Sequence, residues 1–132
     1  MHIEYSASRD FNSEELRELF LSVQWQSGKY PDKLVIAMRN SGAVFSAWKN
    51  GRLVGLINAL DDGIMTAYVH YLLVNPEYHG NGIGKELLRR IKEKYANYPR
   101  IVLISDNRQI AFYKNSGFVA DADSTPMFLD SF

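Results

Sequence analysis

The fold is decided by one stretch of the sequence, VNPEYHGNGIGK at Val74–Lys85. It follows an apolar run, precedes a segment of helical periodicity, and holds glycines at the alternate positions 80, 82 and 84. Glycine allows left-handed backbone angles and lets a ligand approach the main chain, while the free N–H groups of a helix's first turn attract an anion. The stretch therefore predicts a strand, a turn that binds a phosphate or pyrophosphate, and a helix. A tight turn without a ligand is the structural alternative.

Two familiar phosphate-binding loops do not fit this stretch. A Walker loop needs a glycine five positions before Gly84 and a Ser or Thr after Lys85, but those positions hold His79 and Glu86. A dinucleotide-binding loop needs Gly-x-Gly-x-x-Gly early in a βαβ unit, whereas the third glycine here falls one residue short and antiparallel strands are expected before it. A Rossmann-type nucleotide-binding domain is therefore disfavoured.

Strands dominate the chain before the glycine-rich stretch. His2–Ser6 alternates polar and apolar residues, which is typical of a short strand. Ala43–Lys49 and Arg52–Leu60 flank Asn50-Gly51, two residues that tolerate the positive φ of a type I′ hairpin turn. A longer strand, rich in β-branched and aromatic residues, is expected over about Ile64–Val74. The last three strands form an antiparallel meander.

Two helices are expected between the first strand and the meander. Asn12 or Ser13 caps the first, which has acidic residues in its first turn and ends near Gln24–Gly28. A proline opens the second, which ends around Asn40–Gly42. The segment Trp25–Pro31 between them is expected to be a loop.

The chain after the glycine-rich stretch predicts a β-α-β-α unit. A helix of about 12 to 15 residues carries one apolar stripe. The stripe consists of Leu87, Leu88, Ile91 and Tyr95. Ile101–Ile104 is typical of a buried strand, and Asp106 or Asn107 caps a further helix that continues to about Asn115. A last strand is expected around Met127–Leu129.

These elements predict a single domain over residues 1–132 of α/β (α+β) class. Its mixed sheet has an antiparallel N-terminal meander followed by the β-α-β-α unit, whose strand lies parallel to the end of the meander. The chain has 15 Lys and Arg against 15 Asp and Glu, so no overall positive field attracts nucleic acid or an anionic membrane. No leader or membrane-spanning run is visible, and we expect a cytoplasmic protein.

The absence of cysteine narrows the chemistry. With 0 Cys, the chain has no disulfide framework, no thiolate zinc site and no cysteine nucleophile. We expect no metal.

Charge is uneven along the sequence: the segment 79–114 holds eight Lys or Arg against three Asp or Glu, a net charge of +5, which leaves −5 elsewhere. This polarity predicts either phosphate binding on one side and attraction of a cationic amine on the other, or only a solvated helix face.

The glycine-rich loop resembles the Q/R-x-x-G-x-G/A acetyl-coenzyme A signature of the GNAT superfamily of N-acetyltransferases, here at His79–Gly84. It departs at the first position, where His79 replaces Gln or Arg. Leu72–Tyr78 is similar to the end of the family's fourth strand. Asn107–Phe118, which contains Ala111-Phe112-Tyr113 and Ser116-Gly117-Phe118, resembles a later region of the family. The expected order of helices and strands also matches that fold over nearly the whole chain.

The resemblance implies that acetyl-coenzyme A lies between two splayed parallel strands, one ending at Val74 and one starting near Arg100. Its pantetheine would pair with the main chain of the first strand, and its pyrophosphate would bind the loop's N–H groups. Asn107 would approach the pantetheine, although it is equally placed to cap a helix. The expected cofactor-binding residues are Leu72, Leu73, Val74, His79, Gly80, Asn81, Gly82, Ile83, Gly84, Lys85, Asn107 and Phe112.

The resemblance implies that Tyr113 is the general acid that reprotonates the leaving thiolate. His70 titrates in the range that suits a base, and Tyr71 could order a water. Adjacent strand residues face opposite sides, so we expect at most one of these two to face the cleft. Without a cysteine to carry the acetyl group, we expect direct attack by the amine in a ternary complex.

The acceptor site is expected at the loop Trp25–Pro31 and the hairpin near Trp48. Its walls would be aromatic, and the candidate substrate-binding residues are Trp25, Tyr30 and Tyr71, with Tyr68 beside them. The expected partner is a small-molecule amine or a protein amino group, with no nucleic acid and no membrane. The sequence leaves open which amine is acetylated and whether the chain forms a homodimer. The alternative function is a coenzyme A-binding sensor or regulatory domain without turnover.

Overall fold

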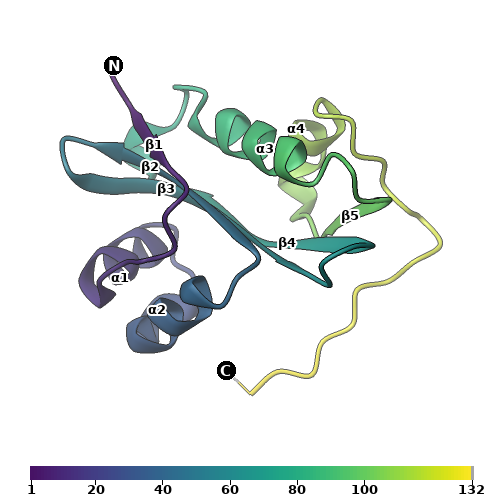
Figure 1. Ribbon diagram of the computed structural model, residues 1–132, viewed down its shortest axis with the longest axis horizontal. Coiled ribbons are helices and arrows are strands. Elements are labelled where there is room, and N and C mark those ends of the chain that lie inside the picture. Colours follow the sequence, from purple (N-terminus) through teal and green to yellow (C-terminus); the bar gives the residue numbers. More distant parts are fainter. Residues whose placement is uncertain (132) are drawn as a thin grey trace. The chain divides into compact units, whose positions relative to one another are not determined.

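The sheet of the computed structural model, which describes residues 1–131, has the strand order β1-β2-β3-β4-β5 (Figure 1). Its strands are β1 Glu4–Ser6, β2 Ala43–Lys49, β3 Arg52–Asp61, β4 Thr66–Val74 and β5 Arg100–Leu103. The first four pair antiparallel in sequence order. The Arg100 N–H donates to the carbonyl of Met65 at 3.3 Å, so β5 begins beside the start of β4 and runs parallel to it. The mixed α/β sheet expected from the sequence is confirmed.

The chain divides into two compact units, Met1–Val102 and the residues from Leu103 onward. In the first unit, helices α1 Ser13–Ser22 and α2 Pro31–Arg39 cover one face of the sheet, and α3 Ile83–Lys94 covers the other (Figure 1). The core on the α1 and α2 side consists of Phe11, Leu16, Leu19, Phe20, Leu34, Met38, Val44, Leu53, Leu56 and Leu73. None of the helices in residues 1–131 is long and apolar enough to cross a membrane.

Local sequence rules explain how these helices begin. Asn12 caps α1, because its side chain accepts the Glu15 N–H at 2.8 Å while the Glu15 carboxylate accepts the Asn12 N–H at 2.8 Å. Pro31 opens α2, as expected. The segment between them is not the plain loop expected from the sequence, because it contains the 3-10 helix η1, Gln26–Lys29. The Tyr30 N–H donates to Ser27 at 3.0 Å and closes that turn.

The β2–β3 hairpin has the predicted turn, since Asn50 and Gly51 both have positive φ, 50° and 81°. The pairing of β3 has two irregularities that were not predicted, one with β2 and one with β4. Ala47 pairs with Gly55 and Trp48 with Leu53, so Val54 is an extra residue. Its carbonyl accepts the N–H of Asn75 at 2.8 Å, which ties the chain after β4 to β3.

The second irregularity lies in β4. Asn58 pairs with Tyr71 and Ala59 pairs with Val69, so His70 is the extra residue of a β-bulge. The expectation that His70 and Tyr71 face opposite sides is wrong, because their rings stack with centroids 4.0 Å apart and planes inclined by 19°. Strict alternation holds only while every residue of a strand has a partner.

The second unit contains the 3-10 helix η3 Asn107–Gln109 and the helix α4 Ile110–Lys114. Asp106 caps η3, its carboxylate accepting the Arg108 N–H at 2.8 Å, so of the two capping residues that the sequence allowed, the structure has Asp106 and not Asn107. The strand expected around Met127–Leu129 is also wrong, because the structure gives these residues no strand pairing and leaves their side chains exposed. An apolar tripeptide becomes a strand only beside an edge that accepts its hydrogen bonds.

Gly55 allows α3 to pack closely on β3. A Cβ at Gly55 would lie 3.0 Å from Cγ2 of Ile83 and 3.3 Å from Cδ1 of Leu87, two buried residues of α3. We expect Gly55→Val to lower the free energy of unfolding in urea by about 1–3 kcal/mol through overpacking, although valine is the better strand residue. Gly55→Ala should lower it less. A valine variant as stable as the wild type would contradict this account of the packing.

Candidate functional site

The glycine-rich loop leads from the end of β4 into α3 through two left-handed glycines. Gly80 has φ 82° and Gly82, the N-cap residue of α3, has φ 75°. Within the described chain, no heavy atom outside the adjoining residues lies within 4 Å of where a Cβ would stand at either position. The backbone of the loop is therefore open to a ligand as well as left-handed.

The first turn of α3 has no side-chain cap among the described residues, and its first bond with the loop runs from the Glu86 N–H to the Gly82 carbonyl at 3.0 Å. The N–H groups before Glu86 therefore point out of the helix end, where the helix dipole is positive. Lys85 lies exposed on this turn. These are the features of an anion site, as the sequence predicted.

The loop is held by polar contacts that follow β4. Asn75 is buried, and its side-chain oxygen accepts the Glu77 N–H at 3.0 Å, which starts the 3-10 helix η2 Pro76–Tyr78. Asn81, which was expected to bind the cofactor, donates from its amide to the Tyr78 carbonyl at 2.9 Å. The loop is thus shaped by its own side chains.

His79 stands where the family signature has Gln or Arg, and its side chain contacts the loop itself. Nε2 lies 2.9 Å from the Val74 carbonyl, and because a carbonyl only accepts, Nε2 carries the proton in this bond. The imidazole therefore binds the last carbonyl of β4, whose second lone pair stays available to another donor. Of Leu72, Leu73 and Val74, only Leu73 is fully buried, and the other two are half-buried.

Arg52, which sequence reasoning did not single out, links the loop to α1. Its Nε donates to Glu18 at 2.6 Å and its Nη1 to Glu77 at 2.8 Å, and its guanidinium lies 5.8 Å from the ring centre of Tyr78. These hydrogen bonds raise the pKa of Arg52. Each partner is far away in sequence, so no local pattern could have indicated the contact.

The bulge of β4 builds an aromatic surface on the α1 and α2 side of the sheet. The His70 ring lies between Tyr71, at 4.0 Å between ring centres, and Tyr68, at 5.5 Å. Partial burial lowers the pKa of His70 below its ordinary 6.5. The imidazole is therefore neutral at pH 7 and able to accept a proton.

Tyr71 also contacts α1 and the segment that follows it. Its ring packs edge-on against Phe20 at 5.0 Å and lies 5.9 Å from Trp25, and its hydroxyl shares a 2.9 Å hydrogen bond with Ser27. The structure thus brings together the candidates Trp25, His70 and Tyr71. Trp25 is 37% exposed, which leaves part of this surface open to a ligand.

Two other aromatic candidates lie in different surroundings. Tyr30 precedes α2, and the Lys33 ammonium lies 5.3 Å from its ring centre. Trp48 stacks on Phe11 with ring centres 6.2 Å apart, and its indole N–H donates to Ser46 at 2.9 Å. Trp48 is therefore a packing residue of the core boundary.

The second unit holds the expected acid. Tyr113 lies on α4, half-buried, with edge-on ring contacts to Phe112 at 5.1 Å and Phe118 at 6.0 Å. Burial raises the pKa of Tyr113 above 10.0, so the phenol stays protonated at neutral pH. Asn107 is exposed at the start of η3.

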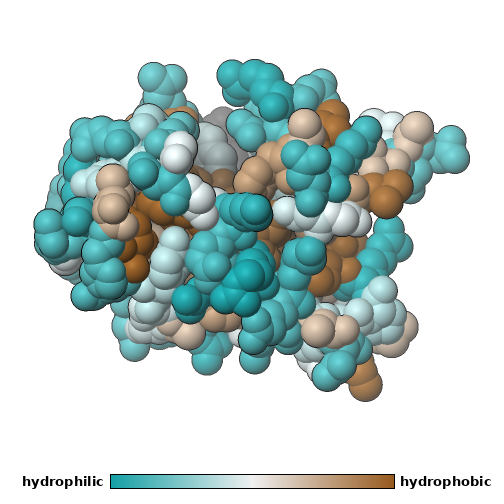
Figure 2. Space-filling model, turned by 90° about the horizontal axis from the view of Figure 1, so that it is seen from above, coloured by the Kyte–Doolittle hydropathy of each residue, from teal (hydrophilic) through white to brown (hydrophobic). Residues whose placement is uncertain are grey.

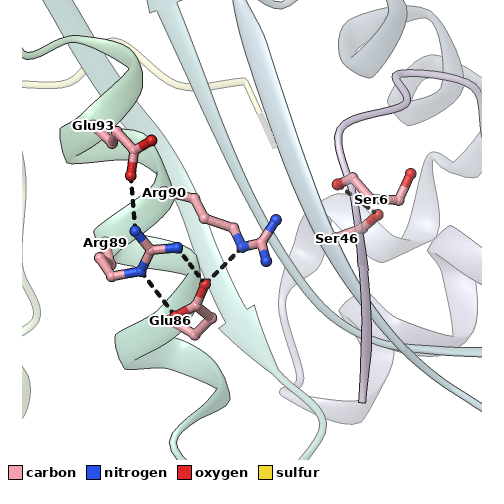
Figure 3. Close-up of polar contacts among 6 residues, drawn as sticks. All are labelled: Ser6, Ser46, Glu86, Arg89, Arg90 and Glu93. Carbon is pink, nitrogen blue, oxygen red and sulfur yellow. Dashed lines mark hydrogen bonds and ion pairs between the residues drawn. The ribbon is translucent and has the colours of Figure 1, made fainter.

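Two arginines of the basic segment bind carboxylates of their own helix (Figure 3). Glu86 accepts from Arg89 at 2.8 and 2.9 Å and from Arg90 at 2.7 Å, and Arg89 also donates to Glu93 at 2.8 Å. These bonds lower the pKa of Glu86 to about 2.

Arg90 also contacts the first strand, because its guanidinium lies over the Tyr5 ring of β1, at 4.6 Å from the ring centre. β1 is in turn tied to β2 by the 3.5 Å hydrogen bond from the Ser46 hydroxyl to the Ser6 carbonyl. Figure 2 shows a mainly hydrophilic surface on this side. Arg89 and Arg90 thus fit the solvated helix face.

Comparison with known proteins identifies the family of this chain. The model of the Acetyltransferase (GNAT) family matches residues 9–118. The chain belongs to this family. It is 31% identical over 125 residues to the uncharacterized N-acetyltransferase ycf52 of Pyropia yezoensis, covering 89% of this chain and 71% of that protein. It is 29% identical to the histone acetyltransferase TAP1 of Glycine max over 132 residues, covering 90% of this chain and 57% of that protein.

The GNAT fold is equally clear from solved structures. The GNAT family protein SP0256 from Streptococcus pneumoniae TIGR4 superposes with a TM-score of 0.85 at 24% identity, covering 98% of both chains. Family membership makes this chain an acetyltransferase and implies acetyl-coenzyme A as its co-substrate. The open, left-handed loop before α3 fits a pyrophosphate, because a Cβ at Gly80 or Gly82 would fill the space next to the main chain.

The stacking of His70 gives a direct test of the aromatic surface. We expect His70 to titrate below 6.5 in an NMR pH titration, and Tyr68→Ala to move its pKa up toward 6.5, because one face of the imidazole becomes hydrated. Tyr78→Ala, which removes a ring that contacts Arg52, is the control and should leave the His70 pKa unchanged. A wild-type His70 that titrates at or above 6.5 would contradict the described environment.

Proposed function

We propose that this chain transfers the acetyl group of acetyl-coenzyme A to a primary amine by direct attack in a ternary complex. The amine nitrogen bonds to the thioester carbonyl carbon, the C–S bond breaks, and the coenzyme leaves as a thiolate. His70 accepts the proton lost by the amine, directly or through water, and Tyr113 gives its proton to the thiolate. The products are an N-acetylated amine and free coenzyme A.

One observation carries the coenzyme half of the proposal, namely the uncapped first turn of α3 behind the left-handed Gly80 and Gly82. Backbone N–H groups there would hold the pyrophosphate, with Lys85 beside them. The pantetheine would pair with the main chain of Leu72–Val74, at the end of β4. The chain contains no cysteine, which supports a reaction without a cysteine acyl-enzyme.

The acceptor half rests on the surface formed by Trp25, Tyr68, His70 and Tyr71. Ring faces attract an ammonium group by cation–π interaction, and a neutral imidazole between them can take its proton. An amine arrives mostly protonated at pH 7, and the lowered pKa of His70 keeps the imidazole neutral at that pH, with a nitrogen able to accept a proton. One relative is named a histone acetyltransferase, which supports protein lysines as acceptors beside small amines.

The proposal is tested by thiol release from acetyl-coenzyme A over a panel of small amines and histone peptides. We expect Tyr113→Phe to lower kcat by about tenfold to a hundredfold while the Kd for acetyl-coenzyme A stays within twofold, because the hydroxyl acts on the leaving group and not on binding. Phe118→Leu, which changes a ring that packs on Tyr113 and keeps the hydroxyl, is the control for packing. Coenzyme binding without turnover of any amine would instead favour a sensor domain.

Two glycines provide a matched test of the loop. Gly82 and Gly51 have similar positive φ, 75° and 81°, and open space where a Cβ would be, so alanine should cost each about 1–2 kcal/mol of stability. Only Gly82→Ala places a methyl group beside the proposed pyrophosphate. By calorimetry we expect a Kd for acetyl-coenzyme A at least tenfold weaker for Gly82→Ala and unchanged for Gly51→Ala. Equal affinities in the two variants would remove the loop from the binding site.

A further inference from the structure

Asn58 of β3 stands opposite the β4 bulge and is 1% exposed. Its Oδ1 accepts the Tyr71 N–H at 2.9 Å, and its Nδ2 donates to Ser41 Oγ at 3.1 Å. Ser41 is equally buried and donates its own proton to the Ala37 carbonyl of α2 at 2.8 Å. A chain of three hydrogen bonds therefore runs from α2 through β3 to the bulged strand.

The side chain of Asn58 adds a hydrogen bond to the sheet at the bulge. At a bulge, two residues face one partner, and the ladder is locally disrupted. A buried backbone N–H without an acceptor is costly, so a bulge is stable only where something accepts that proton. Here the Asn58 carboxamide supplies a buried side-chain acceptor to Tyr71, directly after the extra residue His70.

The residue type fits both ends of the chain of bonds. A backbone N–H only donates, so the group facing Tyr71 must accept, and the Ser41 hydroxyl already gives its proton to Ala37, so the group facing it must donate. A carboxamide does both in one orientation. Leucine has a similar volume but does neither, and an aspartate would bury a charge.

We propose that Asn58 is a positioning residue of the acceptor site, which holds the β4 bulge so that His70 and Tyr71 share one face. Asn58 acts through the Tyr71 N–H and touches no reacting atom. Without the bulge, alternation along β4 would return His70 to the opposite face from Tyr71 and separate the stacked rings. The inference rests on the proposed function for its consequence in catalysis, but the geometry it describes is measurable without turnover.

The test compares Asn58→Leu with Leu56→Ala by NMR and kinetics. Leu56 lies on the same strand and the same core side, and its truncation loosens the core without touching the Tyr71 N–H. In Asn58→Leu we expect at least tenfold faster hydrogen exchange at the Tyr71 amide, normalised to the Leu73 amide, and loss of the ring-current shifts of the His70 protons. In Leu56→Ala the normalised exchange and the His70 shifts should stay as in the wild type.

For Asn58→Leu we expect kcat/KM for the amine to fall by about tenfold or more, while the Kd for acetyl-coenzyme A stays within twofold of the wild-type value. The two effects differ because the misplaced residues, His70 and Tyr71, belong to the acceptor side only. Ser41→Ala, which leaves the acceptor for Tyr71 in place, should give a smaller change in the same direction. It serves as the test variant if Asn58→Leu does not fold. Unchanged His70 shifts and Tyr71 exchange in the folded variants would overturn the inference. If the wild type acetylates no amine, the proposed function fails, and the NMR comparison still decides the role of Asn58.

Discussion

The hydrogen bonding of the sheet at its two bulges is the constraint on which both parts of the candidate site in the first unit depend. At the extra residue Val54 of β3, the carbonyl accepts the Asn75 N–H in the last bond of the β3–β4 ladder, and the glycine-rich loop follows from there. At His70 of β4, the N–H of the next residue, Tyr71, is accepted by the Asn58 side chain. Both bulges therefore lie beside a hydrogen bond that joins β3 to β4 or to the chain directly after it.

The glycine-rich loop is formed mainly by backbone groups, whereas the surface at the β4 bulge is formed by side chains. The proposed coenzyme side is built from main chain, since Gly80 and Gly82 supply left-handed angles and α3 supplies N–H groups, while His79 and Asn81 bind the loop itself. The proposed acceptor side is built from aromatic and imidazole rings. A pyrophosphate carries the same charge whatever the substrate, so a backbone cradle suffices for it. An acceptor amine has to be distinguished from others, and that requires side chains.

The sequence predicted what depends on neighbouring residues. The cap at Asn12, the turn at Asn50-Gly51 and the loop before α3 follow from local rules, and the structure has all three. It could not predict the bulge at His70, because period-two alternation assumes unbroken pairing and the group that stabilises the exception, Asn58, lies 13 positions away from Tyr71. The contact of Arg52 with Glu18 and Glu77 was missed for the same reason.

The bulge also changes what His70 can do chemically. On a regular strand, His70 would face the side of β4 opposite to Tyr71. Placed between Tyr68 and Tyr71 on the α1 and α2 side, its ring loses water on both faces, and its pKa falls, while the residue stays exposed. An imidazole that is neutral and still reachable is what a base for an ammonium group requires. In the proposed reaction, one extra residue in a strand, next to the Tyr71 N–H that a buried carboxamide accepts, thus links the topology of the sheet to the proton that acetyl transfer must remove.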